Sequence, residues 1–347
     1  REQQKRIIAN LTVTIVVAVV TVCANLIVAV LIGIAIASGL FVVRMGRSIV
    51  KRKYYGNQIH SKKVRSIKNN ILLKERGKGI IVYELRGPLF FGSADNLAME
   101  VTSAMKHNTY CILDMKRVDE IDSTGAKILG QISKRINESG KFLLISYLTD
   151  HTSLSDFLKA IGVYNMFAEN CLFPDTDAAL EWAEDNVLTQ SIELAGTFGG
   201  IQLEQMDIFT DFTQEEIHAL KQKLIFKTFK KGEIIVREGD TDRNLFFLTK
   251  GSVSVRIHLP ESERFKRLIT YSSGVTFGEI AFLDGNPRSA DVWSDEDSET
   301  YLLSPDEYGV LQNEAPGIAV KLVRNIALDM SERLRIRTDE VRVLEEG

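Results

Sequence analysis

An uncharged run of 37 residues, from Ile7 to Val43, constrains this chain more than any other stretch of its sequence. The run is rich in Val, Ile, Leu and Ala. One bilayer-crossing helix needs about 20 apolar residues, so 37 residues at about 1.5 Å each would be nearly twice as long as the hydrocarbon layer is thick. We therefore expect two short helices, folded as a transmembrane α-hairpin over residues 1–45, with Asn25 near the reversal.

Positive charge flanks this run on both sides. Lys5 and Arg6 precede it, and residues 44–78 contain twelve Lys or Arg but one acid, Glu75. Because basic flanks stay on the cytoplasmic side, we expect an inner-membrane protein whose remaining domains are cytoplasmic. Residues 46–78 are interpreted as a basic juxtamembrane linker that contacts anionic lipid. Nucleic-acid binding is the rival interpretation, and the adjacent hairpin makes it unnecessary, so no nucleic-acid partner is expected.

The chain begins with Arg1, and we expect it to be the C-terminal part of a longer protein. The residues after the hairpin suffice for two ordinary domains. The three cysteines, Cys23, Cys111 and Cys171, have no metal-ligand spacing, which favours a reducing compartment and predicts no metal site.

Residues 79–189 alternate strand and helix patterns, which predicts a small α/β domain with a sheet covered by helices. The apolar strands are expected at 80–85, 110–115 and 142–146. Asp122 or Ser123 then falls at the start of a helix. One interpretation is a helix N-cap, and the other is that Ser123 or Thr124 is a phosphoacceptor at a helix terminus that tolerates negative charge.

A third region, residues 206–347, follows a linker at 190–205. Short apolar strands at 224–229, 234–236, 245–248 and 253–257 are separated by turn signals. After Pro305 the pattern becomes helical, with one apolar stripe at Leu322, Val323, Ile326, Met330 and Leu334.

Between these strands and helices lies the run FGEIAFLDGNPRSA, residues 277–290. Gly278 would let the backbone approach a ligand, Arg288 would neutralise a phosphate, and Glu279 would accept a hydrogen bond from a sugar hydroxyl. The run therefore predicts a pocket for a small phosphorylated sugar. The alternative is a β-hairpin whose Glu279 and Arg288 pair at the surface.

This run resembles the phosphate-binding cassette of cyclic-nucleotide-binding domains. The resemblance implies a β-roll with flanking helices, in which Glu279 binds the ribose 2′-OH and Arg288 binds the cyclic phosphate. A serine at 289, where a threonine accompanies cGMP preference, favours cAMP over cGMP as the regulatory ligand. The implied binding residues are Phe277, Gly278, Glu279, Ile280, Ala281, Arg288, Ser289 and Ala290.

The resemblance also implies that the C-terminal helix acts as a lid over the purine. Its side chains that could cover the base are Arg335, Arg337 and Thr338, and the sequence does not choose among them. Each could equally belong to a charged helix face in solvent.

Residues 118–125, VDEIDSTG, resemble the signature of STAS domains, and residues 87–92, GPLFFG, are typical of the transporter-attached branch of that family. The resemblance covers residues 70–189. In bacterial antagonists of this family the first hydroxyl after the aspartate is phosphorylated, which by position is Ser123.

The order of hairpin, basic linker, STAS domain and cyclic-nucleotide domain resembles the C-terminal end of a bacterial SulP-type (sulfate permease family) anion transporter. Residues 38–45, SGLFVVRM, resemble the exit from its last helix. The multidomain chain is thus expected to be a regulatory region of a secondary anion transporter of the sulfate or bicarbonate class. It would bind cAMP, relay the signal through the STAS domain, contact membrane lipid and the transporter core, and form a homodimer.

Two other functions remain open. In one, the chain is a membrane-anchored interaction protein controlled by phosphorylation of Ser123. In the other, the terminal domain is a ligand-free dimerisation module, which the intact pair of Glu279 and Arg288 disfavours. The sequence contains no GxxxxGK loop, GxSxG elbow or HExxH pair. We therefore expect no enzyme activity and no cofactor.

Overall fold

The computed structural model describes Leu11, Thr14, Val17, Ala18, Thr21 and residues 26–45, 48–148, 153–195, 200–258 and 265–346. The chain divides into two compact units. The α/β unit comprises Arg1–Lys53 and Tyr83–Thr176, and the roll unit comprises Tyr54–Val82 and Asp177–Gly347.

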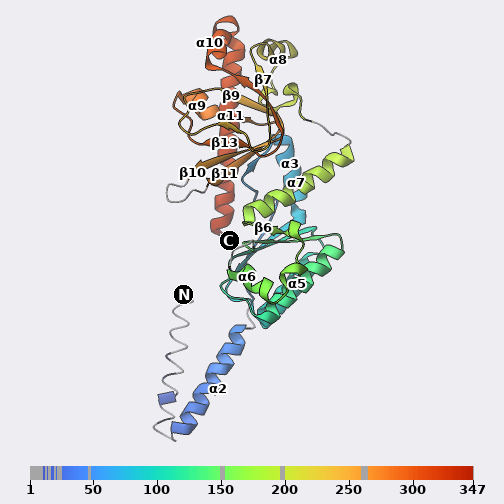
Figure 1. Ribbon diagram of the computed structural model, residues 1–347, viewed down its shortest axis with the longest axis vertical. Coiled ribbons are helices and arrows are strands. Elements are labelled where there is room, and N and C mark those ends of the chain that lie inside the picture. The colour runs from blue at the N-terminus through green and yellow to red at the C-terminus, as the bar shows by residue number, and fades with distance from the viewer. Residues whose placement is uncertain are drawn as a thin grey trace. The chain divides into compact units, whose positions relative to one another are not determined.

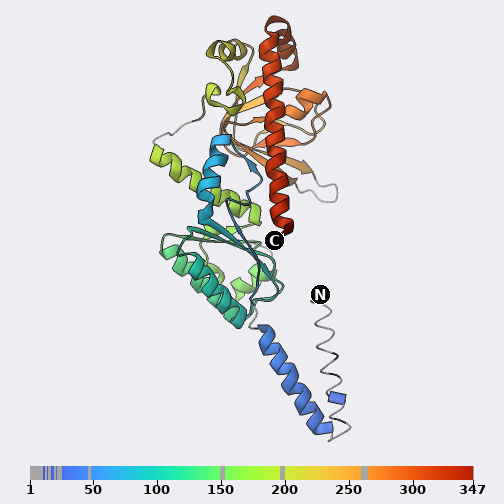
Figure 2. The same ribbon diagram turned by 180° about the vertical axis from the view of Figure 1, so that it is seen from behind.

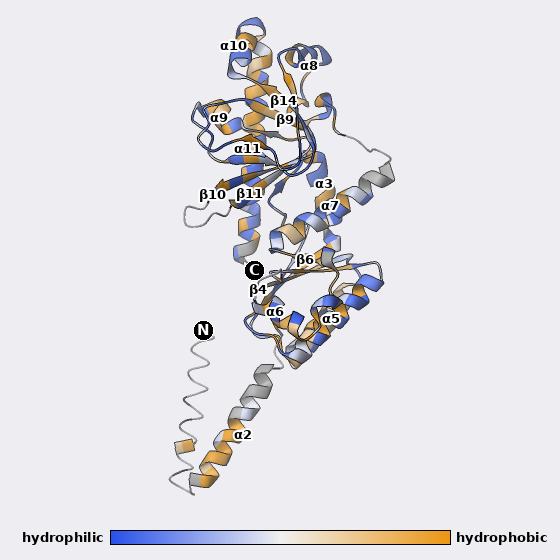
Figure 3. Cartoon of the chain, viewed as in Figure 1, coloured by the Kyte–Doolittle hydropathy of each residue, from blue (hydrophilic) through white to orange (hydrophobic). Residues whose placement is uncertain are grey.

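Helix α2 (Leu26–Met45) is the described part of the predicted hairpin. In the part of this helix that Figure 3 colours by hydropathy, apolar residues predominate. The side chains of Ile27, Leu31 and Ile34 are exposed. The preceding half of the hairpin, apart from five single positions, lies outside the described residues. Within the described part of the chain, no helix combines the length and the apolar character needed to cross a membrane.

The α/β unit is built on a five-stranded sheet with the order β1-β3-β4-β5-β6, in which β4, β5 and β6 are parallel. Its central strands are buried along most of their length, as expected of a sheet covered by helices. The strands are β1 (Val50–Tyr55), β3 (Ile80–Arg86), β4 (Tyr110–Arg117), β5 (Phe142–Ser146) and β6 (Leu172–Phe173).

Three helices connect these strands: α4 (Phe91–Ala104), α5 (Ser123–Glu138) and α6 (Ser153–Ala160). Helix α5 is amphipathic, since one of its faces is buried and carries Ala126, Leu129, Ile132 and Ile136. The described residues of the two units also include short 3-10 helices, namely η1 (Gly77–Gly79), η2 (Tyr164–Met166), η3 (Glu169–Cys171), η4 (Leu203–Gln205) and η5 (Asp207–Phe209).

The roll unit contains two sheets, with the orders β2-β11-β10-β13-β8 and β12-β9-β14-β7. All their described pairings are antiparallel except that of β2 with β11. The strands are β2 (Lys63–Val64), β7 (Ile225–Phe229), β8 (Ile234–Val236), β9 (Leu245–Lys250), β10 (Ser252–His258), β11 (Phe265–Ser272), β12 (Thr276–Phe277), β13 (Asp291–Ser294) and β14 (Ser298–Leu303).

Strand β9 explains how the roll and its helices share one core. Successive side chains of a strand point to opposite faces. Phe246 and Leu248 therefore belong to the cluster inside the roll, whereas Leu245 and Phe247 belong to the cluster formed with the helices. An apolar residue at each of these four positions gives a strand buried on both faces.

Helices α8 (Gln214–Lys221), α9 (Glu279–Asp284), α10 (Pro305–Glu314) and α11 (Pro316–Glu346) accompany the roll. Figures 1 and 2 show the long helix α11 running beside the strands. Its buried residues Leu322 and Ile326 lie in the same cluster as Phe247. Pro316 separates α10 from α11, because proline cannot supply the amide that would continue the preceding helix.

The segment expected to be a juxtamembrane linker, residues 46–78, instead contributes regular structure. It forms β1, β2, helix α3 (Ile67–Arg76) and η1, and from Tyr54 onward it clusters with the roll. Residues 177–189, assigned from the sequence to the α/β domain, belong to helix α7 (Thr176–Ala195), which clusters with the roll from Asp177. The physical reason is charge pairing, since Lys63 and Arg65 form ion pairs with acids on α7.

Candidate cyclic-nucleotide site

The candidate site is formed where β12 ends and the short helix α9 begins. Gly278 occupies this junction with φ 82° and ψ 8°, and Gly285 ends α9 with φ 74°. Residues with a side chain rarely adopt this left-handed conformation, so both positions favour glycine. The two glycines thus confine residues 279–284 to one helical turn and a half.

Gly278 is also needed because of its neighbours. A Cβ atom at this position would lie 2.8 Å from Arg288 Nη1 and 3.0 Å from the carbonyl oxygen of Asn244. Either approach is closer than real Cβ atoms tolerate without displacing the neighbour. The absence of a side chain therefore makes room for the Arg288 guanidinium.

Arg288 is 5% exposed and directs its guanidinium at the backbone. Nη1 donates to the Gly278 carbonyl at 3.0 Å, and Nη2 donates to the Asn244 carbonyl at 2.7 Å. Asp242 lies at the edge of this group, with Oδ1 3.7 Å from Nη2. Among the described residues Nε has no hydrogen-bond partner. Burial lowers the pKa of Arg288, so an anion at this position would be stabilising.

Glu279 is 6% exposed and is the first residue of α9. Burial raises its pKa, and the nearby Arg333 guanidinium opposes this rise. Arg333 comes from α11, and its Nη1 lies 3.5 Å from Glu279 Oε1. A buried carboxylate with one long ionic contact retains acceptor capacity for a hydroxyl group.

The other predicted binding residues divide into buried and exposed ones. Phe277 is buried and stacks on Phe246, with ring centroids 4.8 Å apart. Ala281 and Ala290 are also buried. Ile280 and Ser289 are exposed. The Arg288 guanidinium lies 5.6 Å from the centre of the buried Phe246 ring, whereas Ser289 lies at the surface.

The lid side chains named from the sequence do not reach Glu279. Arg335 and Thr338 are exposed. Arg337 instead pairs with Glu340 at 2.7 Å and donates to the Ser61 carbonyl at 3.2 Å.

Arg333 is the α11 residue that sequence reasoning missed. Besides Glu279 it contacts Asp329 Oδ2 at 2.5 Å and the Thr276 carbonyl at 2.9 Å, and its guanidinium lies 5.2 Å from the centre of the Tyr271 ring. A signal was present, because position 333 is three turns beyond Leu322 and continues the buried stripe of α11. An arginine at such a position indicates a buried partner.

In the α/β unit, Ser123 and Thr124 begin α5 and are exposed. The residue that caps α5 is Asp122, whose Oδ1 accepts from the Gly125 amide at 2.5 Å. The capping interpretation thus holds for Asp122, and the cap does not use the hydroxyl groups of the next two residues.

Comparison with known families identifies two matched regions of the chain. Residues 72–179 match the family described as STAS domain, and residues 226–312 match the family described as Cyclic nucleotide-binding domain. The second match contains Gly278, Glu279 and Arg288.

Several curated proteins are similar to this chain. Glutaminase 2 of Bradyrhizobium diazoefficiens is 27% identical over 289 residues, which cover 83% of this chain and 45% of the relative. Glutaminase 1 of the same organism is 25% identical over 308 residues, covering 86% and 47%. Potassium/sodium hyperpolarization-activated cyclic nucleotide-gated channel 2 of Mus musculus is 30% identical over 195 residues, covering 54% and 21%. The chain spans less than half the length of these relatives.

Among solved structures, a cyclic nucleotide-binding domain from Methylobacillus flagellatus is 23% identical, with a TM-score of 0.36 over 42% of this chain and 79% of its own. The two family matches carry the assignment. This chain contains a STAS domain followed by a cyclic nucleotide-binding domain.

Proposed function

We propose that this chain is the regulatory region of a secondary anion transporter of the SulP type, binding cAMP in its terminal domain. The observation that supports this ligand is the buried Arg288 beside Gly278, whose Nε has no hydrogen-bond partner among the described residues, with Glu279 directly after Gly278 at the start of α9. A cyclic phosphate would supply the missing anion at Arg288. A ribose hydroxyl would donate to Glu279.

Calorimetric titration of the full chain with cAMP and cGMP tests this proposal. The expected result is micromolar binding that is tighter for cAMP and lost in Arg288→Ala. The full chain is needed because the roll unit includes residues 54–82 and α7, which a fragment starting at residue 190 would lack. Equal binding by Arg288→Ala would refute the role of this residue, and silence with both ligands would refute nucleotide regulation.

The membrane part of the proposal is supported by α2, whose side chains Ile27, Val28, Leu31 and Ile34 are exposed although they are apolar. Such a surface is stabilised when lipid or other apolar helices cover it. In this proposal α2 lies in the inner membrane against the transporter core, and both domains are cytoplasmic. Carbonate extraction of cell membranes tests this, since release of the chain into the soluble fraction would contradict it.

A second candidate effector comes from the relatives named glutaminase, which match more than four-fifths of this chain. In that case the same two domains would regulate an enzyme rather than a transporter. We propose that the chain itself is not an enzyme under either candidate. Ammonia release from glutamine by the purified chain would overturn this, and cAMP-dependent anion uptake in a reconstituted system would favour the transporter.

The exposed hydroxyl group of Ser123 supports a third candidate, in which phosphorylation controls a partner of the STAS domain. Incubation with cell extract and ATP, followed by mass spectrometry, tests it. Phosphate on Ser123 or Thr124 would favour this candidate, and its absence would weaken it. Light scattering of the purified chain checks the homodimer that all three candidates assume.

A further inference from the structure

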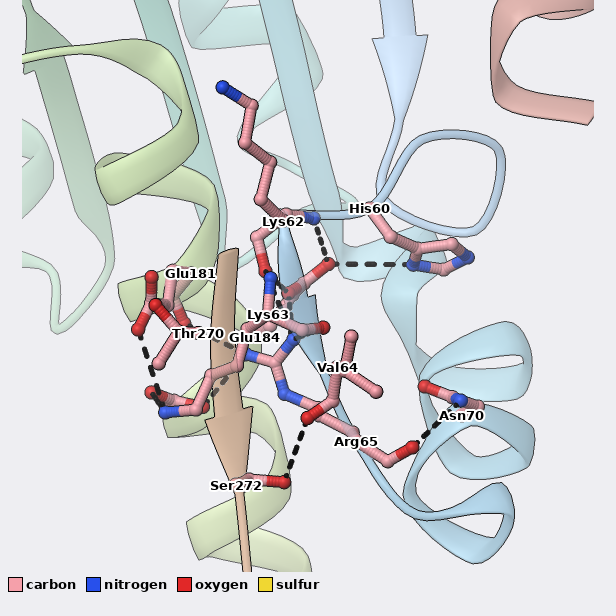
Figure 4. Close-up of polar contacts among 12 residues, drawn as sticks. His60, Lys62, Lys63, Val64, Arg65, Asn70, Glu181, Glu184, Thr270 and Ser272 are labelled. Atoms are coloured by element: carbon pink, nitrogen blue, oxygen red, sulfur yellow. Dashed lines mark hydrogen bonds and ion pairs between the residues drawn. The ribbon is translucent and has the colours of Figure 1, made fainter. Parts of the chain in front are cut away.

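Helix α3 follows β2 in the roll unit and is attached to that unit along one side. Asn70 Nδ2 donates to the Arg65 carbonyl at 3.2 Å, as Figure 4 shows. Leu73 is 1% exposed. The Ile67 amide donates to Asp207 Oδ2 at 2.5 Å, which fixes the first turn of the helix. Helix α3 is therefore a defined part of the surface of this unit, and not a free linker.

The other side of α3 carries two exposed isoleucines. Ile67 is 50% exposed and Ile71 is 55% exposed. Because they are four residues apart, they lie on the same face of the helix, one turn from each other. A single exposed apolar residue is ordinary, whereas two neighbouring ones form a small apolar patch.

The charges near this patch indicate what it contacts. Four lysines in α3 or close to it in the sequence are exposed, namely Lys62, Lys68, Lys74 and Lys78. Lys74 is seven residues after Ile67 and so continues the face of the two isoleucines. The only acid of the helix is Glu75. The exposed surface of α3 is thus apolar and basic.

No acid of the described part of the chain forms an ion pair with these four lysines. Lys63 differs, because its Nζ lies 2.8 Å from Asp185 Oδ2 of α7. Figure 4 shows the Lys62 side chain extending away from the ion pairs of its neighbours. Exposed lysines elsewhere on the roll unit are paired, as Lys230 is with Asp297 at 2.8 Å. The positive charge on α3 is therefore available to a partner of opposite charge.

We propose that the face of α3 formed by Ile67, Ile71 and Lys74, with the other three lysines beside it, binds the surface of an anionic bilayer. This inference rests on the proposed location of the chain at the membrane, and it adds a second lipid contact to that of α2. The isoleucine side chains enter the boundary between headgroups and acyl chains, while the ammonium groups stay among the lipid phosphates. Charge attracts the helix to the bilayer, and the two isoleucines set its depth.

Nucleic acid is the other large polyanion that such a surface could meet. Its backbone is bound through charge, and its bases are bound by stacking on aromatic side chains or arginine. The exposed face of α3 offers aliphatic side chains beside its lysines, and the helix contains no aromatic residue. An anionic bilayer matches both the charge and the aliphatic patch, whereas nucleic acid matches the charge alone.

An environment-sensitive dye attached to the full chain tests the contact directly. Ile71→Cys carries the dye on the proposed face. Ile225→Cys is the matched control, because Ile225 is 51% exposed in β7, away from α3 in the sequence. Cys111 and Cys171 are buried, and Cys23→Ser in both labelled chains removes the third native thiol.

The labelled chains are mixed with vesicles of phosphatidylcholine, with or without phosphatidylglycerol. The dye at position 71 should brighten when phosphatidylglycerol is present and lose this response at high salt, which screens the charges. The dye at position 225 should respond to neither vesicle. Silence at position 71, or an equal response at position 225, overturns the proposal.

Replacing the lysines tests the role of charge. Each lysine near an anionic surface favours contact by about fivefold, so removing all four should abolish the response at position 71. This variant combines Lys62→Gln, Lys68→Gln, Lys74→Gln and Lys78→Gln. The matched control removes the same charge from four paired lysines and should keep the response; it combines Lys221→Gln, Lys223→Gln, Lys230→Gln and Lys250→Gln. Equal losses in both variants would show an effect of net charge and overturn the assignment to α3.

Sedimentation of the full chain with neutral vesicles reports the insertion of α2 separately. A chain that stays in the supernatant with phosphatidylcholine, yet responds at position 71 to phosphatidylglycerol, supports the α3 contact and overturns the proposed insertion of α2. A chain that sediments with neutral vesicles but is silent at position 71 with either vesicle overturns the α3 contact alone. A response at position 71 to duplex DNA and not to anionic vesicles overturns it in favour of nucleic acid.

Discussion

Arg333 Nη1 lies 3.5 Å from Glu279 Oε1, although the two residues are 54 positions apart in the sequence. Glu279 is the carboxylate that the proposed site offers to a ribose hydroxyl, and Arg333 belongs to the helix beside the roll. The contact therefore joins ligand recognition to the position of α11. Because Glu279 would accept the ribose hydroxyl, its protonation should change the affinity for nucleotide.

Nucleotide affinity should fall as the pH is lowered through the pKa of Glu279. Burial raises that pKa above the usual value of a glutamate, and Arg333 only partly opposes the rise. Protonation converts an acceptor-only carboxylate into a carboxyl group that carries a proton of its own and accepts the ribose hydroxyl less strongly. Calorimetry with cAMP from pH 7.5 down to about pH 5 measures this loss, which should begin at a pH higher than a glutamate of ordinary pKa would give. Glu279→Gln should bind more weakly and show no such pH dependence, and a wild-type profile parallel to that of Glu279→Gln would contradict the assignment.

Glu279→Gln should stabilise the ligand-free protein while weakening ligand binding. A buried carboxyl group with a raised pKa binds its proton more tightly in the folded state than in the unfolded state. Its contribution to stability therefore falls as the pH rises from the unfolded pKa to the folded one, and at neutral pH the charged form is a cost. Removing the charge should raise the free energy of unfolding by about 1 kcal/mol, or about 2–4 °C in Tm. Arg333 keeps its contacts with Asp329 and Thr276 in this variant. Thermal unfolding without ligand, followed by the Tm increase on adding cAMP, checks both effects, and a lower ligand-free Tm would count against them.

Gly278→Ala should damage both the fold and the site. Alanine in the left-handed conformation costs about 1–2 kcal/mol, and its Cβ atom would also displace the Arg288 guanidinium. We expect a lower Tm and a loss of cAMP binding comparable to that of Arg288→Ala. Gly309→Ala is the matched control, because a Cβ atom at Gly309 meets nothing within 4 Å and the residue lies inside α10. That variant should gain up to about 1 kcal/mol and keep its affinity.

The sequence predicted the centre of the site because the chemistry is local there. Gly278, Glu279 and Arg288 lie within eleven consecutive residues, and a turn conformation, a buried charge and an acceptor can each be inferred from residue type. Arg333 was missed because its partner depends on how α11 packs against the roll, which residue type alone does not determine. The candidates Arg335, Arg337 and Thr338 followed from helix position, whereas the structure shows Arg337 donating to the Ser61 carbonyl.

Strand and helix patterns were predicted where burial is periodic. Strand β5, residues 142–146, has the predicted bounds, and so has β8 at 234–236. The segment 46–78 was interpreted as a linker because its basic composition was the only signal that was used. Its actual structure depends on the acids of α7, more than a hundred residues later, which neutralise Lys63 and Arg65. Such long-range charge pairing leaves no periodic signal in the segment itself.

Asp122→Ala should destabilise the α/β unit by about 1 kcal/mol, the usual worth of a helix N-cap. Asp122→Asn keeps an oxygen acceptor for the Gly125 amide and should cost much less. Chemical denaturation followed by circular dichroism compares the two variants. Equal destabilisation by both would show that the charge, and not the cap, is what α5 requires. Ser123→Ala provides a separate control, since an exposed hydroxyl that does not cap the helix should leave stability unchanged.

Arg65→Met should be the most destabilising single change in residues 60–65. Arg65 and Glu184 form a buried pair, and removing one partner of such a pair typically costs about 3–5 kcal/mol because the other charge stays buried and uncompensated. The double variant Arg65→Met with Glu184→Leu should recover most of this loss, as apolar residues can replace a buried ion pair.

The same pair predicts an acid sensitivity. Burial alone would raise the pKa of Glu184, but Arg65 and the hydrogen bond from Ser61 hold it below its usual value. A carboxyl group with a lowered folded pKa stabilises the protein above its unfolded pKa, and this contribution is lost as the pH falls toward the folded pKa. Unfolding measured between pH 7 and about pH 3 should therefore show a smaller acid-dependent loss in the double variant than in the wild-type chain. Identical pH profiles would mean that residues 60–65 are held by the strand pairing of β2 with β11 and not by this charge pair.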